Sequence, residues 1–453
     1  MQIASVKQDT KVLKKEEFFK DDIHENTSEE DDFIAKIELS VKRINANNDL
    51  SILIDDFFFL ISYIEKKDFV FTTDFILKVL SFLKDEQDTQ EKQIVLKLLR
   101  LMTAFDSPMQ QILINNHIFD ILFKYFPNEE VIDTFSNLSC ANSDARSYLL
   151  NSGIINFIFQ YIDSIDHFEC LIHLSQNLLC RMANFQYDNY IPQFIQLFHK
   201  IISLINKEIE FSPDLIVGAF RDYVDADDRL LDDFLINNQL EVFLNLYSRD
   251  YNFLRPLLRI CETIIYQKKE DGAHYLINCN IIHFITEIIF NGDREIRVFS
   301  FNFLYLLVDY APDITNNLIS QDFHTILFSE FNDKLSIRYR TFIYKFCCLL
   351  LVNSSPQYLT ELIKVGIVDM LVDYPSILIH ERDWGILLDG IVKIVKFNGF
   401  DDSEIIQEKL KDIKENQEFI DWLYEACQSR KSDISELANM VESLLHDQAL
   451  NCI

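Results

Sequence analysis

A ten-residue pattern recurs along the chain: an apolar pair, a short polar stretch, and then a run of mostly apolar residues. It is clearest in LLNSGIINFI at 149–158. The other copies are LINNHIFDIL (113–122), LINNQLEVFL (235–244), LINCNIIHFI (276–285), LISQDFHTIL (318–327) and LIKVGIVDML (362–371). Each copy predicts that one helix ends and a second apolar helix follows at once, because the polar break is too short for a long loop.

The fifth place of the pattern is where the backbone must turn. It holds His117, Gly153, Gln239, Asn280, Asp322 and Gly366. Gly, Asn, Asp and His are the residues that best tolerate a left-handed or capping conformation, and Gln239 fits poorly. We therefore interpret the place as a helix junction in most copies.

The copies start about 36 to 44 residues apart, except for one interval twice as long that contains the degenerate copy YIPQFIQLF (190–198). A period of this length, with two or three helices per unit, is typical of armadillo and HEAT arrays. The composition agrees, because 453 residues contain only eight Gly and eight Pro but 49% apolar residues. Few turn formers and a large apolar fraction predict an all-α fold.

The stretch VIDTFSNLSCANSDARSYLLNSGIINFIFQYI at 131–162 resembles an armadillo repeat. In that family DTFSNLS would be the third helix of one unit, DARSYLLNSG the first helix of the next, and IINFIFQYI its second. The resemblance implies a right-handed α-solenoid of about eight units whose third helices line a concave groove. We expect a charged, flexible N-terminal arm at 1–32, a single solenoid at 33–447 and a short tail at 448–453.

The layout is also similar to that of importin-α, which binds basic peptides through a Trp and an Asn four residues apart on each third helix. Here Asn137 and Asn184 match the Asn, whereas Asp133 and Cys180 stand where the Trp would be. The partner-binding candidates that follow from this register are Asn137, Asn184, Glu262 and Asp309.

Charge narrows the class of partner. The chain carries 72 acidic and 42 basic residues, a formal net charge of -30. This acidity disfavours nucleic acid and anionic membranes, and it favours a protein or an extended peptide rich in Lys and Arg.

Cysteine usage and hydropathy bear on localisation. Nine irregularly spaced Cys, including the adjacent Cys347 and Cys348, read as reduced core residues, and no signal peptide or membrane span is evident. We expect a cytoplasmic protein, which would shuttle to the nucleus if it acted in import.

Candidate chemistry is sparse, and we expect no catalytic residue, metal or cofactor. The sequence has no glycine-rich phosphate loop, HExxH or G-x-S-x-G. His167, Cys170, His173 and Cys180 are spaced so that one helix could not gather them, and we interpret them as helix packing. The acidic RDYVDADD (221–228) lacks the Gly and final Glu of a calcium loop, and we interpret it as a solvated interhelix loop.

The leading hypothesis is therefore a non-catalytic armadillo-type scaffold or adaptor that binds a peptide or protein in its groove. One alternative is a divergent importin-α-like nuclear import adaptor that binds basic nuclear-localisation peptides. A second alternative is a regulatory subunit of an enzyme complex.

Overall fold

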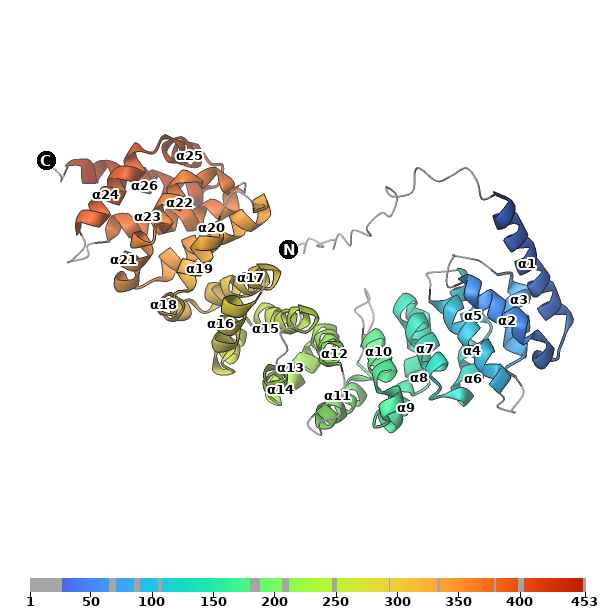
Figure 1. Cartoon of the computed structure of the whole chain (residues 1–453). Helices are drawn as coiled ribbons and strands as arrows, with labels where there is room; N and C mark the ends of the chain where they lie inside the picture. Colours follow the sequence, from blue (N-terminus) through green and yellow to red (C-terminus); the bar gives the residue numbers. More distant parts are fainter. Residues whose placement is uncertain are drawn as a thin grey trace. The chain divides into compact units, whose positions relative to one another are not determined.

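The computed structural model describes residues 27–64, 71–84, 90–104, 108–179, 188–205, 212–246, 251–292, 294–331, 335–378, 380–397 and 403–450. Every regular element in these ranges is a helix, and the predicted all-α class is confirmed (Figure 1). The chain divides into two compact units, Met1–Met182 and Ala183–Ile453, which are described separately.

The helices of the first unit are α1 (Thr27–Ala46), α2 (Leu50–Ile64), α3 (Thr73–Ser81), α4 (Gln90–Thr103), α5 (Pro108–Asn115), α6 (Ile118–Leu122), α7 (Glu129–Ala141), α8 (Ser143–Asn151), α9 (Ile154–Tyr161) and α10 (Phe168–Leu179).

The helices of the second unit are α11 (Ile191–Ile205), α12 (Pro213–Ala226), α13 (Asp228–Ile236), α14 (Gln239–Asn245), α15 (Tyr251–Asn278), α16 (Ile281–Asn291), α17 (Arg294–Tyr310), α18 (Thr315–Ser320), α19 (Phe323–Glu330), α20 (Ile337–Asn353), α21 (Pro356–Lys364), α22 (Ile367–Asp373), α23 (Trp384–Lys396), α24 (Ser403–Glu415), α25 (Gln417–Cys427) and α26 (Ser432–Leu450).

The expected boundaries of the arm and the tail both fall inside helices. α1 begins at Thr27, upstream of the expected boundary at residue 32, and α26 continues to Leu450, past residue 447. Most of the predicted arm, residues 1–26, and the last residues of the tail, 451–453, lie outside the described residues.

The predicted helix junctions are confirmed at five of the six copies. His117, Gly153, Asn280, Asp322 and Gly366 all have positive φ and each precedes the first residue of a helix. At the remaining copy the left-handed residue is Asn238 (φ 48°), one place earlier than predicted, and Gln239 is the first, buried residue of α14. The shift follows from chemistry, because an Asn side chain tolerates this conformation better than Gln does.

Residues 128–161 illustrate why the helices begin and end where they do. The Asn128 side chain caps α7 by accepting a hydrogen bond from the Glu130 backbone, and the Asn142 side chain caps α8 in the same way from Asp144 and Ala145. Gly153 then turns the chain into α9. α7, α8 and α9 coincide with the three predicted helices of 131–162.

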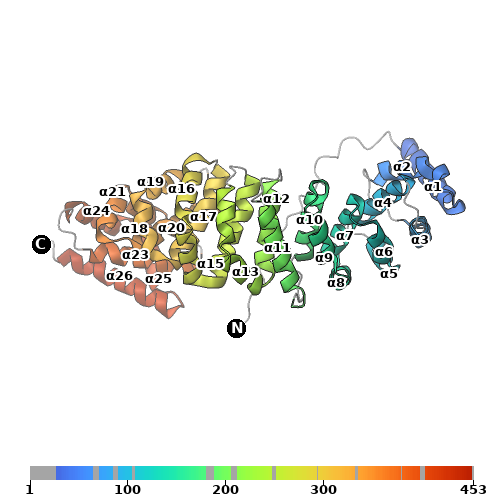
Figure 2. The same cartoon turned by 90° about the horizontal axis from the view of Figure 1, so that it is seen from below.

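In each unit one series of helices packs in succession. α4, α7 and α10 form the series in the first unit, and α12, α15, α17, α20, α23 and α26 form it in the second (Figures 1 and 2). We call these the stacked helices. Their core is rich in phenylalanine, for example Phe135 on α7 and Phe220 on α12, both fully buried. Cys347 and Cys348 on α20 are buried and free, as predicted.

The interpretation of RDYVDADD as a solvated loop is wrong for most of its length. Asp222 and Asp225 lie in α12, and the Asp225 carboxylate accepts a 2.6 Å hydrogen bond from Thr263 Oγ1 on α15. Asp227 joins α12 to α13 and caps α13 by accepting from the Arg229 backbone N–H. Asp225 therefore serves helix packing, and Asp227 serves helix capping.

Candidate functional site

Asn137 lies on α7 and faces the neighbouring stacked helix. Its Nδ2 is 3.4 Å from both the Arg100 carbonyl oxygen and Thr103 Oγ1 on α4. These distances are at the long end for hydrogen bonds, so the half-buried amide is held loosely between the two helices.

Asn184 lies outside the described residues, and the structure points to a different asparagine on the next stacked helix. Asn177 on α10 donates from Nδ2 to Ser136 Oγ at 2.6 Å, so it bridges α10 to α7 as Asn137 bridges α7 to α4. The sequence contains a signal for this match: Asn-Leu-x-Cys occurs both at 137–140 and at 177–180, and it aligns Asn177 with Asn137. Sequence reasoning missed it by aligning Cys180 with the absent Trp.

Glu262 on α15 is a buried carboxylate with two partners. Its side chain is 3% exposed; Oε2 accepts from Arg259 at 2.6 Å, and Oε1 accepts from Asn302 Nδ2 on α17 at 3.2 Å. Burial raises the pKa of Glu262, and the charge and hydrogen bond of Arg259 oppose that rise. This residue therefore joins two stacked helices.

Asp309 is exposed near the end of α17, and partial burial raises the pKa of its carboxyl. No cation among the described residues forms an ion pair with it. Tyr266 on α15 is 55% exposed, and its pKa is raised by burial and by the charges of Glu262 and Asp309. Glu262 and Asp309 both contribute to the electrostatic environment of this tyrosine.

A second tyrosine extends this region toward α20. Burial raises the pKa of Tyr305 on α17 to about 12, with Asp309 contributing next. The Tyr305 ring packs edge-on against Phe342 and Phe346 of α20, with centroids 5.7 and 6.1 Å apart. We call Tyr266 on α15 together with Tyr305 and Asp309 on α17 the acidic–aromatic surface. Carboxylates beside aromatic rings bind cationic groups such as lysine and arginine side chains.

A separate acidic hollow lies farther along the second unit. It encloses about 590 Å³ and is lined by Trp384, Trp422 and the carboxylates of Glu418, Asp421 and Glu425 on α25. Trp384 Nε1 donates to the Leu378 carbonyl oxygen at 2.7 Å, and the two indoles pack edge to face. Both tryptophans are nearly buried, so their main contribution is to the core.

No single helix within the described ranges is long and apolar enough to cross a membrane. The adjoining helices Asn252–Asn278 and Ile281–Asn291 reach that length and apolarity only when taken together, and they meet at a 73° bend.

These features define an all-α protein whose polar side chains connect neighbouring helices. No family model and no curated protein matches its sequence. Among solved structures, it is similar to the crystal structure of an engineered protein from the Northeast Structural Genomics Consortium, with a TM-score of 0.69 and 10% identity over 91% of this chain and 99% of the other. A second engineered protein from the same consortium aligns over 51% of this chain and 98% of its own, with 13% identity and a TM-score of 0.44. The first similarity concerns the fold alone.

Proposed function

We propose that this chain is a non-catalytic scaffold or adaptor, built as a right-handed α-solenoid of armadillo-like repeats, that binds an extended peptide or a protein. The recurrence of the left-handed junction supports a repeat architecture. Stacked repeats present equivalent positions at regular intervals, and such a surface suits an extended partner.

Hydrogen bonds between side chains and neighbouring helices support the same architecture, because they recur at a sequence separation of about one repeat. The examples are Asn177 with Ser136 (41 residues apart), Thr263 with Asp225 (38), Asn302 with Glu262 (40), Lys393 with the Val352 carbonyl (41) and Lys409 with Asp369 (40). A constant separation is expected when each repeat contacts the next one in sequence.

The acidic–aromatic surface carries the proposal for the partner. Asp309 is partly desolvated without a paired cation among the described residues, and a lysine or arginine side chain would supply that cation while lying against the exposed Tyr266 ring. We therefore propose a Lys/Arg-rich segment as the partner, met in the cytoplasm.

The test is a titration of the full chain with a Lys/Arg-rich peptide at several salt concentrations. Asp309→Asn and Tyr266→Ala should each weaken binding, and higher salt should weaken it further. Asp313→Asn removes a nearby exposed carboxylate and serves as the matched control that should bind normally. Absence of binding at low salt, or equal binding by all variants, would overturn the proposed partner class.

The same titration distinguishes the proposed binding surface from the groove of an importin-α-like import adaptor. An importin-α-like groove would depend on Asn137 and its counterpart Asn177, so Asn137→Ala and Asn177→Ala would weaken binding of the basic peptide. Under the present proposal these substitutions leave binding unchanged, because both amides already bridge neighbouring helices.

A further inference from the structure

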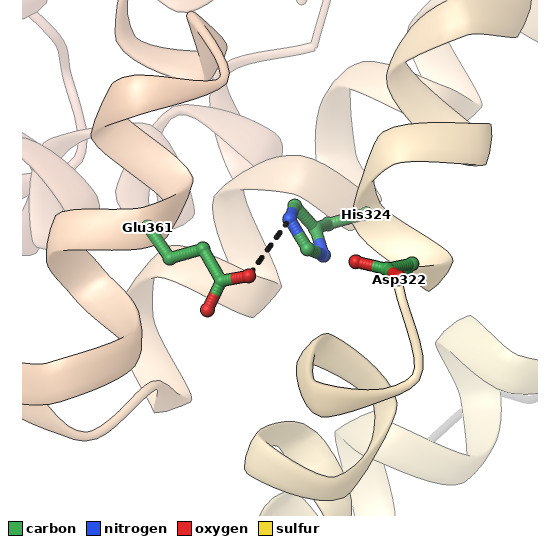
Figure 3. Close-up of side chains that lie close together, drawn as sticks. All are labelled: Asp322, His324 and Glu361. Carbon is green, nitrogen blue, oxygen red and sulfur yellow. Dashed lines mark ion pairs between the residues drawn. The ribbon is translucent and has the colours of Figure 1, made fainter.

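The geometry points to a binding site for a divalent transition metal of the zinc class, formed by Asp322, His324 and Glu361 (Figure 3). One ligand atom from each residue lies within 4.8 Å of the other two. His324 Nε2 and Glu361 Oε1 are 3.8 Å apart. In Figure 3 the imidazole lies between the two carboxylates, with Glu361 on one side and Asp322 on the other.

The three ligands come from consecutive copies of the repeat pattern. Asp322 is the left-handed junction residue before α19, and His324 is the second residue of that helix. Glu361 lies on α21, the helix that leads to the next junction at Gly366. A bound ion would therefore join two successive repeats.

His324 occupies a place that is apolar in the other copies. The residue two places after each left-handed junction is buried throughout the described copies, and elsewhere it is Phe119, Ile155, Leu240, Ile282 or Val368. His324 is equally buried, at 1% exposure, yet it carries two ring nitrogens. Packing alone does not account for an imidazole at a core position.

The environment of the ring also favours a bound cation. Nε2 of His324 faces Glu361 and also lies 3.4 Å from Thr325 Oγ1, and Nδ1 is buried. Burial lowers the pKa of His324, and the charges of Glu361 and Asp322 and a hydrogen bond with the Ile319 backbone oppose that shift. A neutral imidazole is the form that coordinates a metal, and the two carboxylates supply the negative charge that a divalent ion requires.

The donor set selects the class of metal. One imidazole nitrogen and two carboxylate oxygens suit zinc and related first-row ions, whereas calcium and magnesium prefer oxygen ligands alone. Zinc–ligand bonds of about 2.0–2.2 Å place neighbouring ligand atoms about 3.3–3.5 Å apart in a tetrahedron. The three ligand atoms, which lie within 4.8 Å of one another, would therefore have to move closer together when the ion binds. The exposed Asp322 and the half-buried Glu361 leave a route for the ion and for a water ligand.

The test is isothermal titration of the chelator-treated full chain with zinc chloride, together with thermal unfolding. We expect one ion per chain, a micromolar or lower Kd, a higher Tm with zinc, and no competition from calcium. Asp322→Asn and Glu361→Gln should each weaken binding by about tenfold or more. Cobalt(II) should give visible absorption bands that are lost in the same variants.

His324→Leu provides a variant that should fold, because the other copies hold apolar residues at this place. We expect it to lose zinc binding while its metal-free Tm equals or exceeds that of the unmodified chain. The control is His199→Gln, which removes another histidine beside a carboxylate, Asp233, and should bind zinc normally. Zinc binding that survives His324→Leu, or no binding by the unmodified chain, would overturn the proposed site.

Discussion

Two pairs of stacked helices, one in each unit, are joined by polar groups of different charge. In the first unit, Asn177 on α10 donates to the Ser136 hydroxyl on α7. In the second, Asn302 on α17 donates to the buried Glu262 carboxylate on α15. The residue separations, 41 and 40, are nearly equal. The packing of neighbouring stacked helices is therefore compatible with either a neutral or a charged link.

The largest expected effect tests whether the two units unfold separately. Phe135 is surrounded by the rings of Phe119, Phe123 and Phe126, and Phe220 by a similar aromatic cluster. Phe135→Ala and Phe220→Ala should each cost about 3–5 kcal/mol, because a large cavity replaces a fully buried ring. Amide hydrogen exchange should show lost protection mainly in the unit that carries the substitution. Equal loss in both units would mean that they unfold together.

A smaller effect, alike in the two units, is expected at the glycine junctions. Gly153 and Gly366 have φ of 79° and 93°, and an added Cβ would meet neighbours only at ordinary contact distances. Gly153→Ala and Gly366→Ala should therefore each cost about 1 kcal/mol, from backbone strain rather than from clashes. Asn at either place should cost less, as Asn280 already adopts this conformation. Denaturant unfolding measures the difference; a much larger loss at one glycine would show that local packing differs.

The junctions also show which features of the fold can be predicted from the sequence alone. A left-handed residue between two apolar helices is a local requirement, so residue type identified five junctions and the helices of 131–162. The exception is Asn238, which is the left-handed residue where Gln239 was predicted. The prediction followed the alignment of the six copies, although Asn adopts this conformation more readily than Gln. Contacts between helices that are distant in sequence could not be predicted in this way. Asn177 was missed, and the cluster of Asp322, His324 and Glu361 depends on how α21 packs near α19, which no local pattern specifies.

The two polar links should differ when they are measured by double-mutant cycles. We expect coupling of about 1 kcal/mol between Asn177 and Ser136, and a similar or somewhat larger value between Asn302 and Glu262, whose acceptor can be ionised. Cycles built from Asn177→Ala with Ser136→Ala, and from Asn302→Ala with Glu262→Ala, give both values. Lowering the pH should reduce only the coupling energy between Asn302 and Glu262, because protonation of Glu262 removes its charge. Equal pH responses would contradict an ionised acceptor.

The smallest expected effect is the contribution of Glu262 to the pH dependence of the free energy of unfolding, and its sign can be predicted. Burial raises its folded-state pKa above the ordinary value of 4.5, so the folded chain retains a proton there after the unfolded chain has lost it. The free energy of unfolding should therefore contain a contribution that decreases as pH rises from about 4.5 through the raised pKa. Glu262→Gln should remove this contribution and change stability at neutral pH by less than about 1 kcal/mol, since the amide oxygen can still accept a hydrogen bond from Asn302.

Asp313→Asn, at an exposed carboxylate, is the control. If the pH slope of stability is unchanged in Glu262→Gln, the slope arises from the ionisation of another group. The slope thus reports on the charge that distinguishes the Asn302–Glu262 link from the neutral Asn177–Ser136 link.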